Sequence, residues 1–303
     1  GATEPRRMIR ALYDCPAPAK INLFLHVVGR RDDGYHLLQS LFQLVDWQDT
    51  LHFERRDDGR LLRHDLGAPL PEDDLCLRAA RALQRESGTA CGADIHIAKQ
   101  VPWGAGLGGG SSDAATTLLA LNRLWNLNWP RPRLLAMGLA LGADVPFFIG
   151  GENAWVEGVG ERLTPLAVPS QPYAIVKPPV AIATRDIFCS PLLTRDTAPA
   201  ILLGSLADDH EVRRLVAWAE GDGRNDLQPA AEAACPEVAQ AARWLEARYG
   251  NSRMTGSGSA VFSRAGACSP PMATLPADEL PPGWVGRMCR GLEHHPLRDW
   301  ALG

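Results

Sequence analysis

Several features that mark other classes of protein are missing from this sequence of 303 residues. No apolar run approaches the roughly 18 residues of a membrane-spanning helix, and residues 1–15 lack the apolar core of a secretion signal. The seven cysteines are scattered and form no C-x-x-C pair, which argues against a zinc knuckle or a disulfide framework. The net charge is -4, and Lys and Arg are spread along the chain, which argues against a nucleic-acid partner. We therefore expect a cytoplasmic protein with free thiols that binds neither nucleic acid nor a membrane.

Glycine, in contrast, is concentrated in one place, the stretch VPWGAGLGGGSSDAATT at residues 101–117. Five glycines lie between Gly104 and Gly110, more than a tight turn needs, which predicts unusual backbone angles or the close approach of a ligand. Residues 93–102 alternate like a strand, and residues 114–125 have one apolar stripe at helical spacing. We expect Ser111 and Ser112 to cap this helix. Its N-terminus would bind an anion, most often a phosphate.

Three kinds of phosphate-binding loop compete for this stretch. The pattern G-x-G-x-x-G is present, but a dinucleotide-binding fold also needs an acidic residue about 20 positions later, and none occurs between Ala114 and Ala143. A Walker A loop ends in G-K-[ST], and no lysine lies between Gly104 and Trp129. What remains is a glycine-serine loop before a helix, with a lysine and an aspartate supplied by distant parts of the chain.

The rest of the chain reads as two mixed α/β domains with a cleft between them. The hydrophobic content of 46% is enough for substantial cores. The segment VPSQP at 168–172 is a plausible linker, and we place the domains at 8–167 and 168–303. The expected strands are 20–28, 36–45, 50–56, 93–102, a hairpin at 152–166, 173–178 and 260–265, and the expected helices are 74–87, 114–125, 131–142, 208–219 and 230–248.

Two charged residues stand where they could do chemistry. In AKINLF the strand period puts Lys20, Asn22 and Phe24 on one face and aliphatic side chains on the other. Because the aliphatic face packs on the core, we expect Lys20 and Asn22 to point away from it together. Taken alone, such a lysine is most often an ordinary exposed residue. Asp144 lies between an expected apolar helix and an expected apolar strand, and local sequence fits a helix-end hydrogen-bonding residue and a catalytic base equally well.

These segments together resemble the GHMP kinases, the superfamily of galactokinase, homoserine kinase and mevalonate kinase. The stretch PWGAGLGGGSSDAA looks like their phosphate loop, and the resemblance runs from Pro18 to Phe262, through most of the chain. The DGYH motif is typical of those members that phosphorylate 4-diphosphocytidyl-2-C-methyl-D-erythritol. The resemblance implies an α+β fold of two domains, an N-terminal nucleotide-binding α/β domain and a C-terminal α/β plait domain, with the active site in the cleft. The further segments that carry it are PAKINLFLHVVGRRDDGYHLLQSLFQLVDWQDTL, LGADVPFFIGGENAWVEGVGERLTPL, GRNDLQPAA and RMTGSGSAVF.

The same resemblance implies an enzyme that uses ATP and Mg²⁺ to phosphorylate the 2-hydroxyl of this substrate in the non-mevalonate isoprenoid pathway. Lys20 would contact the acceptor hydroxyl and Asp144, and Asp144 would act as the base. Tyr35 would stack on the cytosine, His36 would hydrogen-bond its edge, and Phe188 would close its other side. The other implied residues are Lys99, Pro102, Gly104, Gly106, Leu107, Gly108, Gly109, Gly110, Ser111 and Ser112 for ATP, and Asn22, Thr184, Gly256 and Ser257 for the substrate.

Some positions depart from the family pattern. Trp103 stands before the loop glycines where the family commonly has a small or aliphatic residue, and Asp74 replaces a common asparagine of the adenine pocket. Ionised Asp accepts hydrogen bonds but cannot donate one, so Asp74 cannot make the donor contact of an asparagine. Glu152, Glu157 and Glu161 are nearby acidic residues, but the sequence selects none of them as a Mg²⁺ ligand.

Two other interpretations remain open at this point. A GHMP kinase with a different acceptor, such as homoserine or a mevalonate, would keep Lys20, Asp144 and the glycine loop without needing DGYH or Phe188. A nucleotide-binding sensor that has lost catalysis would keep the fold, although the presence of both Lys20 and Asp144 speaks against it. We expect a monomer or a weak homodimer.

Overall fold

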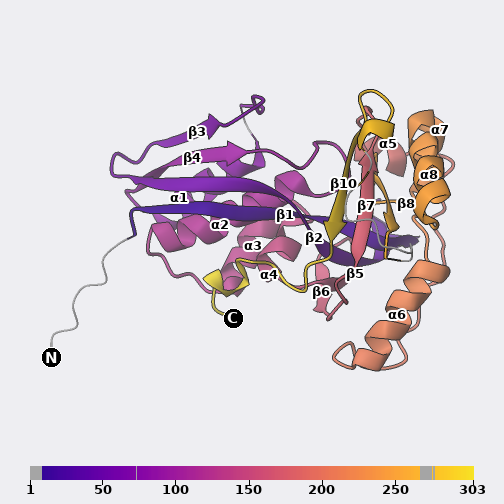
Figure 1. Cartoon of the computed structure of the whole chain (residues 1–303). Coiled ribbons are helices and arrows are strands. Elements are labelled where there is room, and N and C mark those ends of the chain that lie inside the picture. Colours follow the sequence, from indigo (N-terminus) through magenta and orange to yellow (C-terminus); the bar gives the residue numbers. More distant parts are fainter. Residues whose placement is uncertain (1–8, 73, 267–274, 276) are drawn as a thin grey trace.

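Two long antiparallel strands, β1 (Ala11–Arg30) and β2 (His36–Arg56), run from one lobe of the molecule into the other (Figure 1). The structure, a computed structural model, describes residues 9–72, 74–266, 275 and 277–303. The predicted break between strands 36–45 and 50–56 is wrong, because residues 46–49 continue β2. Polar residues there resemble a loop in sequence, yet Asp49 is fully buried and its carboxylate accepts two backbone N–H bonds.

The first lobe is a six-stranded sheet with helices on one face (Figure 1). Its other elements are β3 (Leu61–Asp65), β4 (Gly92–Ala98), β5 (Ala154–Gly158), β6 (Arg162–Pro165), α1 (Leu75–Ser87), α2 (Gly109–Leu124), α3 (Arg131–Leu141) and α4 (Val145–Gly150). The strand order is β3-β4-β2-β5-β6, and β1 pairs with β2. Helix α2 lies at the centre and is buried along most of its length, because it packs against the sheet, α1 and α4 at once.

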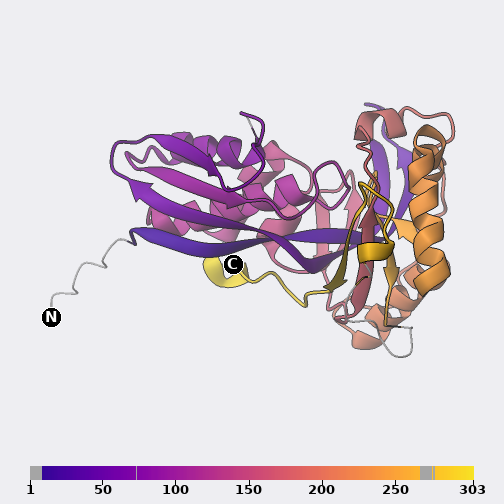
Figure 2. The same cartoon turned by 45° about the horizontal axis from the view of Figure 1, so that its top comes forward.

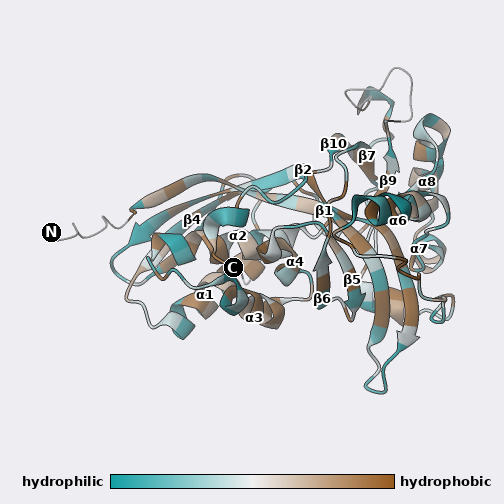
Figure 3. Ribbon diagram, turned by 90° about the horizontal axis from the view of Figure 1, so that it is seen from below, coloured by the Kyte–Doolittle hydropathy of each residue, from teal (hydrophilic) through white to brown (hydrophobic). Residues whose placement is uncertain are grey.

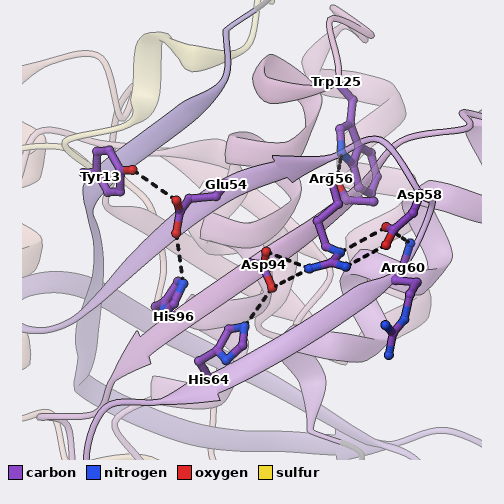
Figure 4. A network of polar contacts seen from close by, with 10 residues as sticks. Tyr13, Glu54, Arg56, Asp58, Arg60, His64, Asp94, His96 and Trp125 are labelled. Carbon is purple, nitrogen blue, oxygen red and sulfur yellow. Dashed lines mark hydrogen bonds and ion pairs between the residues drawn. The ribbon is translucent and has the colours of Figure 1, made fainter.

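The opposite face of this sheet carries polar side chains (Figure 4). Arg56 on β2 pairs with Asp94 on β4 at 3.1 Å, and His64 on β3 contacts the same carboxylate at 2.8 Å. His96 contacts Glu54 at 3.1 Å and stacks on His64 with ring centroids 4.4 Å apart. The residues between them along β4, such as Ile95, are buried. This alternation is typical of an antiparallel sheet with one face in solvent.

The second lobe is a four-stranded antiparallel sheet with its helices on the outer side (Figure 2). Its elements are β7 (Pro172–Lys177), β8 (Arg253–Met254), β9 (Val261–Arg264), β10 (Val285–Arg290), α5 (Thr184–Phe188), α6 (Asp209–Gly221), α7 (Gln228–Ala234) and α8 (Pro236–Tyr249), with short 3-10 turns η1 (Ala277–Glu279) and η2 (Arg298–Trp300). The strand order is β10-β7-β9-β8. Hydrophilic residues gather on outer helices and loops, α6 among them (Figure 3). The two sheets and their helices confirm the predicted α+β class.

Three predictions about helices are wrong for local reasons. The predicted helix 230–248 is two helices, α7 and α8, because Cys235 is extended and Pro236 begins the second. The apolar run after Asp144 forms α4 rather than a strand. Helix α2 begins at Gly109 with Gly108 as its N-cap, so Ser111 and Ser112 lie inside its first turn and do not cap it.

The last residues of the chain return to the first lobe (Figure 1). Leu297 and Ala301 are buried in the core beneath the first sheet. The Arg131 amide donates to the Leu302 carbonyl at 2.7 Å, and the Asn153 side chain donates to the Leu292 carbonyl at 2.8 Å. The division into domains at residue 168 stays a prediction.

Within the described ranges, no helix is both long enough and apolar enough to cross a membrane. The six described cysteines are all free, as expected, and Cys268 lies outside the described residues.

Candidate active site

A cleft of about 930 Å³ lies where β1, the glycine loop and the second lobe meet. It brings together side chains and backbone from segments that are far apart in sequence. The sequence-predicted residues that line it are Lys20, Asn22, Tyr35, His36, Gly104, Gly106, Gly108, Asp144, Thr184, Phe188, Gly256 and Ser257. The predicted residues outside the lining are Lys99, Pro102, Leu107, Gly109, Gly110, Ser111 and Ser112.

Lys20 is held in the cleft wall by β1. Its side chain is only 2% exposed, it donates to the Asn22 side-chain oxygen, and its ammonium lies 4.8 Å from the centre of the Phe42 ring. Burial lowers the pKa of Lys20, and the nearby charge of Asp144 opposes that effect. The electrostatic coupling and the shared cleft place the ammonium and the Asp144 carboxylate on the same side of the molecule.

The shared face predicted for Lys20, Asn22 and Phe24 holds only for the first two. The register of β1 against β2 shifts between Asn22 and Phe24, and such an irregularity turns the following side chains. Phe24 is therefore in the core, with its ring 5.4 Å from that of Trp155 and 4.9 Å from that of Trp218. The irregularity separates the polar part of β1 from its apolar part.

Asn22 connects the first lobe to the second glycine-rich turn, residues 255–258. The Asn22 amide N–H donates to Thr255 Oγ1 at 2.9 Å, and the Gly256 N–H donates to Asn22 Oδ1 at 2.9 Å. Its Nδ2 donates to Ser40 Oγ at 3.0 Å. With its backbone N–H and both side-chain polar atoms engaged, Asn22 fixes the position of Lys20 and of the turn relative to each other.

Asp144 occupies the N-cap position of α4, but its side chain makes no capping hydrogen bond. Among the described residues the Asp144 carboxylate has no hydrogen-bond or ion-pair partner. The sequence left open whether this residue serves the helix end or the chemistry. A cleft-lining carboxylate that leaves the helix end uncapped is available to accept a proton.

The glycine loop lies against the turn 255–258 backbone to backbone. Gly106 has φ +79°, and a Cβ on it would lie 2.3 Å from the Thr255 carbonyl oxygen. Gly256 has φ +55°, and a Cβ there would lie 2.9 Å from the Gly106 oxygen. Ala260 N–H donates to the Ala105 carbonyl at 2.9 Å. Only glycine fits these two positions, so the glycines join the lobes as well as shaping the loop.

Helix α2 begins directly behind this loop, so its first-turn N–H groups and positive dipole end are next to the cleft. Ser112 Oγ is buried in this turn and has no hydrogen-bond partner among the described residues. A glycine cradle, a helix N-terminus and an unpartnered hydroxyl fit a polyphosphate group.

Lys99, predicted to bind ATP, is engaged inside the protein. Its ammonium lies 2.6 Å from Asp49 Oδ2 and 2.8 Å from Asp113 Oδ2. Burial would lower the pKa of Lys99, but the charges of Asp113 and Asp49 outweigh it and raise that pKa. Burial raises the pKa of Asp113 despite the nearby ammonium. The triad ties β2 and the residue that follows β4 to the N-terminal part of α2.

Aromatic side chains form the far end of the cleft. Tyr35, in the turn between β1 and β2, is 64% exposed. The rings of His36 and Phe188 face each other with centroids 4.8 Å apart and planes inclined by 34°. Thr184 and Ser257, from the second lobe, share a hydrogen bond of 2.8 Å between their hydroxyls. This end can receive a flat ring between aromatic groups.

Sequence reasoning missed Arg195, which also lines the cleft. Its Nε donates to His36 Nε2 at 3.0 Å, across 159 positions of sequence. It lies in an irregular segment between α5 and α6, where neither periodicity nor a motif singles out one arginine. Ser40 and Thr255 were missed for the same reason, since their roles depend on Asn22.

The residues that depart from the family pattern have structural partners. Asp74 caps α1 by accepting from the Leu77 N–H at 3.1 Å and pairs with Arg63 at 2.9 Å. Trp103 is 75% exposed and does not line the cleft.

The three glutamates near Asp144 are likewise engaged. Glu152 pairs with Arg298 at 3.1 Å, Glu157 accepts from Trp155 Nε1 at 3.0 Å, and Glu161 accepts from the Val159 N–H at 2.7 Å. Within the described residues no three His, Cys, Asp or Glu side chains form a group that could hold a metal ion.

Comparisons with known proteins agree with this geometry. The model of the GHMP kinases N terminal domain matches residues 74–152, and the model named GHMP kinases C terminal matches residues 202–266. A protein of Methylibium petroleiphilum named 4-diphosphocytidyl-2-C-methyl-D-erythritol kinase is 65% identical over 97% of this chain and 99% of its own length. A protein of the same name from Variovorax paradoxus is 54% identical over 97% of this chain and 100% of its own length.

Solved structures show the same relationship. The crystal structure of a 4-(cytidine 5'-diphospho)-2C-methyl-D-erythritol kinase matches with a TM-score of 0.72 and 33% identity, over 91% of this chain and 99% of that one. The homoserine kinase of Cytophaga hutchinsonii shares the fold, with a TM-score of 0.60 at 19% identity over 86% of each chain. The chain therefore belongs to the GHMP kinases, in the family of the 4-diphosphocytidyl-2-C-methyl-D-erythritol kinases.

Proposed function

We propose that this protein transfers the γ-phosphoryl group of ATP to the 2-hydroxyl of 4-diphosphocytidyl-2-C-methyl-D-erythritol, a step of the non-mevalonate isoprenoid pathway. The observation that carries the proposal is the cleft that holds Lys20, Asp144 and both glycine-rich turns, in a chain 65% identical over nearly its whole length to a kinase of that name. We further propose that the enzyme works in the cytoplasm as a monomer or a weak homodimer.

Asp144 is the proposed base. Its carboxylate takes the proton of the 2-hydroxyl as the hydroxyl oxygen forms its bond to the γ-phosphorus, and the bond from that phosphorus to the bridging oxygen breaks to release ADP. Lys20 orients the hydroxyl and Asp144, and its positive charge stabilises the negative charge that gathers on the transferring group. No covalent intermediate with the enzyme is needed.

The glycine loop and the first turn of α2 are the proposed site for the ATP phosphates. Gly104, Gly106 and Gly108 line the cleft with backbone that carries no side chain, and the Ser112 hydroxyl makes no hydrogen bond to any described residue. Mg²⁺ bound to the phosphates would neutralise part of their charge. Because the nearby glutamates are engaged, we propose that Mg²⁺ would be held mainly through the phosphates, with the hydroxyls of Ser111 and Ser112 in the first turn of α2 as the protein groups that could contribute.

Tyr35, His36 and Phe188 are the proposed binding residues for the cytosine ring. Asn22 and the turn at Gly256 and Ser257 would position the part of the substrate between the base and the reacting hydroxyl. The distribution fits a long substrate, because the aromatic end and the Lys20–Asp144 end belong to the same cleft.

The test is an ADP-release assay of the purified protein with ATP and Mg²⁺, in which the cytidylyl substrate is compared with homoserine and mevalonate. We expect turnover with the cytidylyl substrate alone. Turnover with another acceptor would make the protein a different GHMP kinase. ATP binding by calorimetry without turnover on any acceptor would make it a nucleotide-binding sensor.

Asp144→Asn tests the base. We expect kcat to fall by at least about 100-fold, because general-base catalysis contributes roughly 10²- to 10⁴-fold, while the affinity for ATP measured by calorimetry stays the same. Asp209→Asn, which removes an exposed carboxylate in the first turn of α6, is the control and should leave kcat unchanged. An Asp144→Asn enzyme within a few-fold of wild type would remove Asp144 from this role.

A further inference from the structure

Arg195 holds the imidazole of His36 in a defined state. Its Nε–H donates to His36 Nε2 at 3.0 Å. An arginine side chain can only donate hydrogen bonds, so His36 Nε2 must be the accepting, unprotonated nitrogen. The proton of a neutral imidazole is then on Nδ1, because the bond made by one ring nitrogen sets the state of the other.

The surroundings keep this imidazole neutral. Burial, followed by the positive charges of Arg195 and Arg30, lowers the pKa of His36. Within the described part of the chain, Nδ1 of His36 has no hydrogen-bond partner, and the residue lines the cleft. His36 therefore offers one N–H donor to a ligand there.

A fixed donor distinguishes between pyrimidines. Position 3 of cytosine is a bare ring nitrogen that accepts a hydrogen bond, whereas position 3 of uracil carries a hydrogen and donates one. A site whose polar group is fixed as a donor rejects the base that presents a donor, because two donors then face each other without partners.

We propose that Arg195 is a positioning residue that sets the base specificity of the cleft. Because its guanidinium only donates hydrogen bonds, its bond to His36 Nε2 fixes His36 Nδ1 as a donor, which selects cytosine over uracil. The inference rests on the proposed function, since it assigns the aromatic end of the cleft to the base of the substrate. Arg195 does not itself touch the base.

The setting of Arg195 gives it the rigidity that this role requires. Its Nη2 donates to the Phe188 carbonyl at 2.7 Å and to the Ser190 carbonyl at 3.3 Å, and its Nη1 donates to the Leu193 carbonyl at 3.3 Å. The same guanidinium thus holds the backbone of Phe188, whose ring faces His36. The stacking ring and the hydrogen-bonding ring are positioned together.

The first test measures the protonation state of His36 in the wild-type protein. The protein is labelled with ¹⁵N in its eight histidines, His36 is assigned from the signal lost in His36→Gln, and the ring nitrogens are observed by NMR at pH 7.5. We expect the signature of a neutral ring protonated on Nδ1. A ring protonated on Nε2, or on both nitrogens, would overturn the proposal.

The second test measures specificity as the ratio of kcat/KM for the cytidylyl substrate to kcat/KM for its uridylyl analogue, at saturating ATP. We expect a ratio of at least about 10 in wild type, since one well-placed base contact gives roughly that discrimination. In Arg195→Met the ratio should fall toward 1 through a higher KM for the cytidylyl substrate, with kcat changed little. Arg195→Lys, which keeps a donor, should recover part of the ratio.

A purely structural role for Arg195 predicts a different result. Loss of its bonds to the 188–193 backbone would weaken both substrates equally and leave the ratio unchanged, and that result would overturn the proposal. Arg213→Met, which removes an exposed arginine of α6 that does not line the cleft, is the control and should leave the ratio at its wild-type value. If wild type turns over neither substrate, the proposed function fails, whereas turnover with an unchanged ratio in Arg195→Met refutes this inference alone.

Discussion

Lys20 and Lys99 are two buried lysines whose surroundings give them different capacities. Lys99 is neutralised by two carboxylates within 2.8 Å. Lys20 forms no ion pair with any described residue and keeps only the neutral Asn22 oxygen as a close partner. The charge of Asp144 offsets part of the cost of burying Lys20, but a buried charge without an ion-pair partner stays costly, so its retention in the cleft wall is best explained by an anionic ligand that arrives during function.

Tyr35 provides a prediction about a single side chain. Tyr35 is 64% exposed. The contact of its aromatic ring with water is unfavourable, and a ligand that covers the ring would remove that contact. We expect Tyr35→Ala to weaken the binding of the cytidylyl substrate by about 1–3 kcal/mol, roughly 5- to 150-fold in Kd, as for other base-stacking aromatics. Calorimetry with a non-hydrolysable ATP analogue present measures this change.

Tyr13 is the matched control, because it is similarly exposed, at 60%. It lies on the polar face of the first sheet next to Glu54 (Figure 4). Tyr13→Ala should leave substrate affinity unchanged. Equal affinities for wild type and Tyr35→Ala would show that Tyr35 does not stack on the base.

Site residues that belong to a recognisable motif could be predicted from the sequence. Site residues whose role depends on a contact with a distant residue could not. The resemblance put Lys20, Asp144 and the glycines in one site, whereas local sequence alone singled out only the glycine loop. The role of Arg195 depends on its hydrogen bond to His36. The two residues meet only in the folded protein, so the sequence could not predict this pair. The same applies to Lys99, whose motif predicted a nucleotide contact while its two carboxylate partners lie on β2 and α2.

At the scale of elements, the loop before α2 was predictable because its glycine content far exceeds what a turn needs. Its counterpart, the turn 255–258, was assigned a role only by the resemblance. The structure supplies the physical reason, which is that Gly106 and Gly256 lie too close to the facing backbone for any side chain. Helix α4 was misread because the apolar run VPFFIG is buried in either conformation, and periodicity cannot assign so short a segment.

The Lys99 triad gives a prediction for the contact between α2 and the sheet. Lys99→Met would leave Asp49 and Asp113, both buried, without their cation. Breaking a buried ion pair by removing one partner costs about 3–5 kcal/mol. We expect a loss of that size in the free energy of unfolding, measured by urea denaturation without nucleotide.

Lys177→Met serves as the control. Among the described residues Lys177 donates to the carbonyls of Pro178 and Val180 and forms no ion pair, so its loss should cost about 1–2 kcal/mol, less than the loss of Lys99. If Lys99→Met kept full stability and lost only ATP affinity, Lys99 would be a nucleotide ligand, as the sequence predicted, rather than the centre of a structural triad.

At the scale of the whole molecule, the lobes are joined in three ways that together hold the cleft. Strands β1 and β2 pass through both lobes (Figure 1), and the Asn22–Gly256 hydrogen bond connects β1 to the turn 255–258. The third connection is residues 292–303, which leave β10 and pack on the first lobe. The sequence predicted a single division, at 168, because nothing in the composition of residues 292–303 indicates that they return to the first lobe.

Two leucines near the C-terminus test this third connection. Leu297 is 4% exposed and belongs to the core of the first lobe, whereas Leu302, five positions later, is 81% exposed. Leu297→Ala removes buried methyl groups and leaves a cavity, so we expect it to lower the free energy of unfolding by about 2–5 kcal/mol. Leu302→Ala should change it by no more than about 0.5 kcal/mol.

Urea denaturation followed by circular dichroism measures both variants, and the ATP affinity of the folded Leu297→Ala protein reports on the first lobe directly. The physical reason to expect a large difference is that the terminal segment fills the first core even though it follows the last strand of the second lobe. Equal and small effects for the two leucines would mean that residues 292–303 contribute nothing to the first core. The cleft would then be held by the strands and the glycine turns alone.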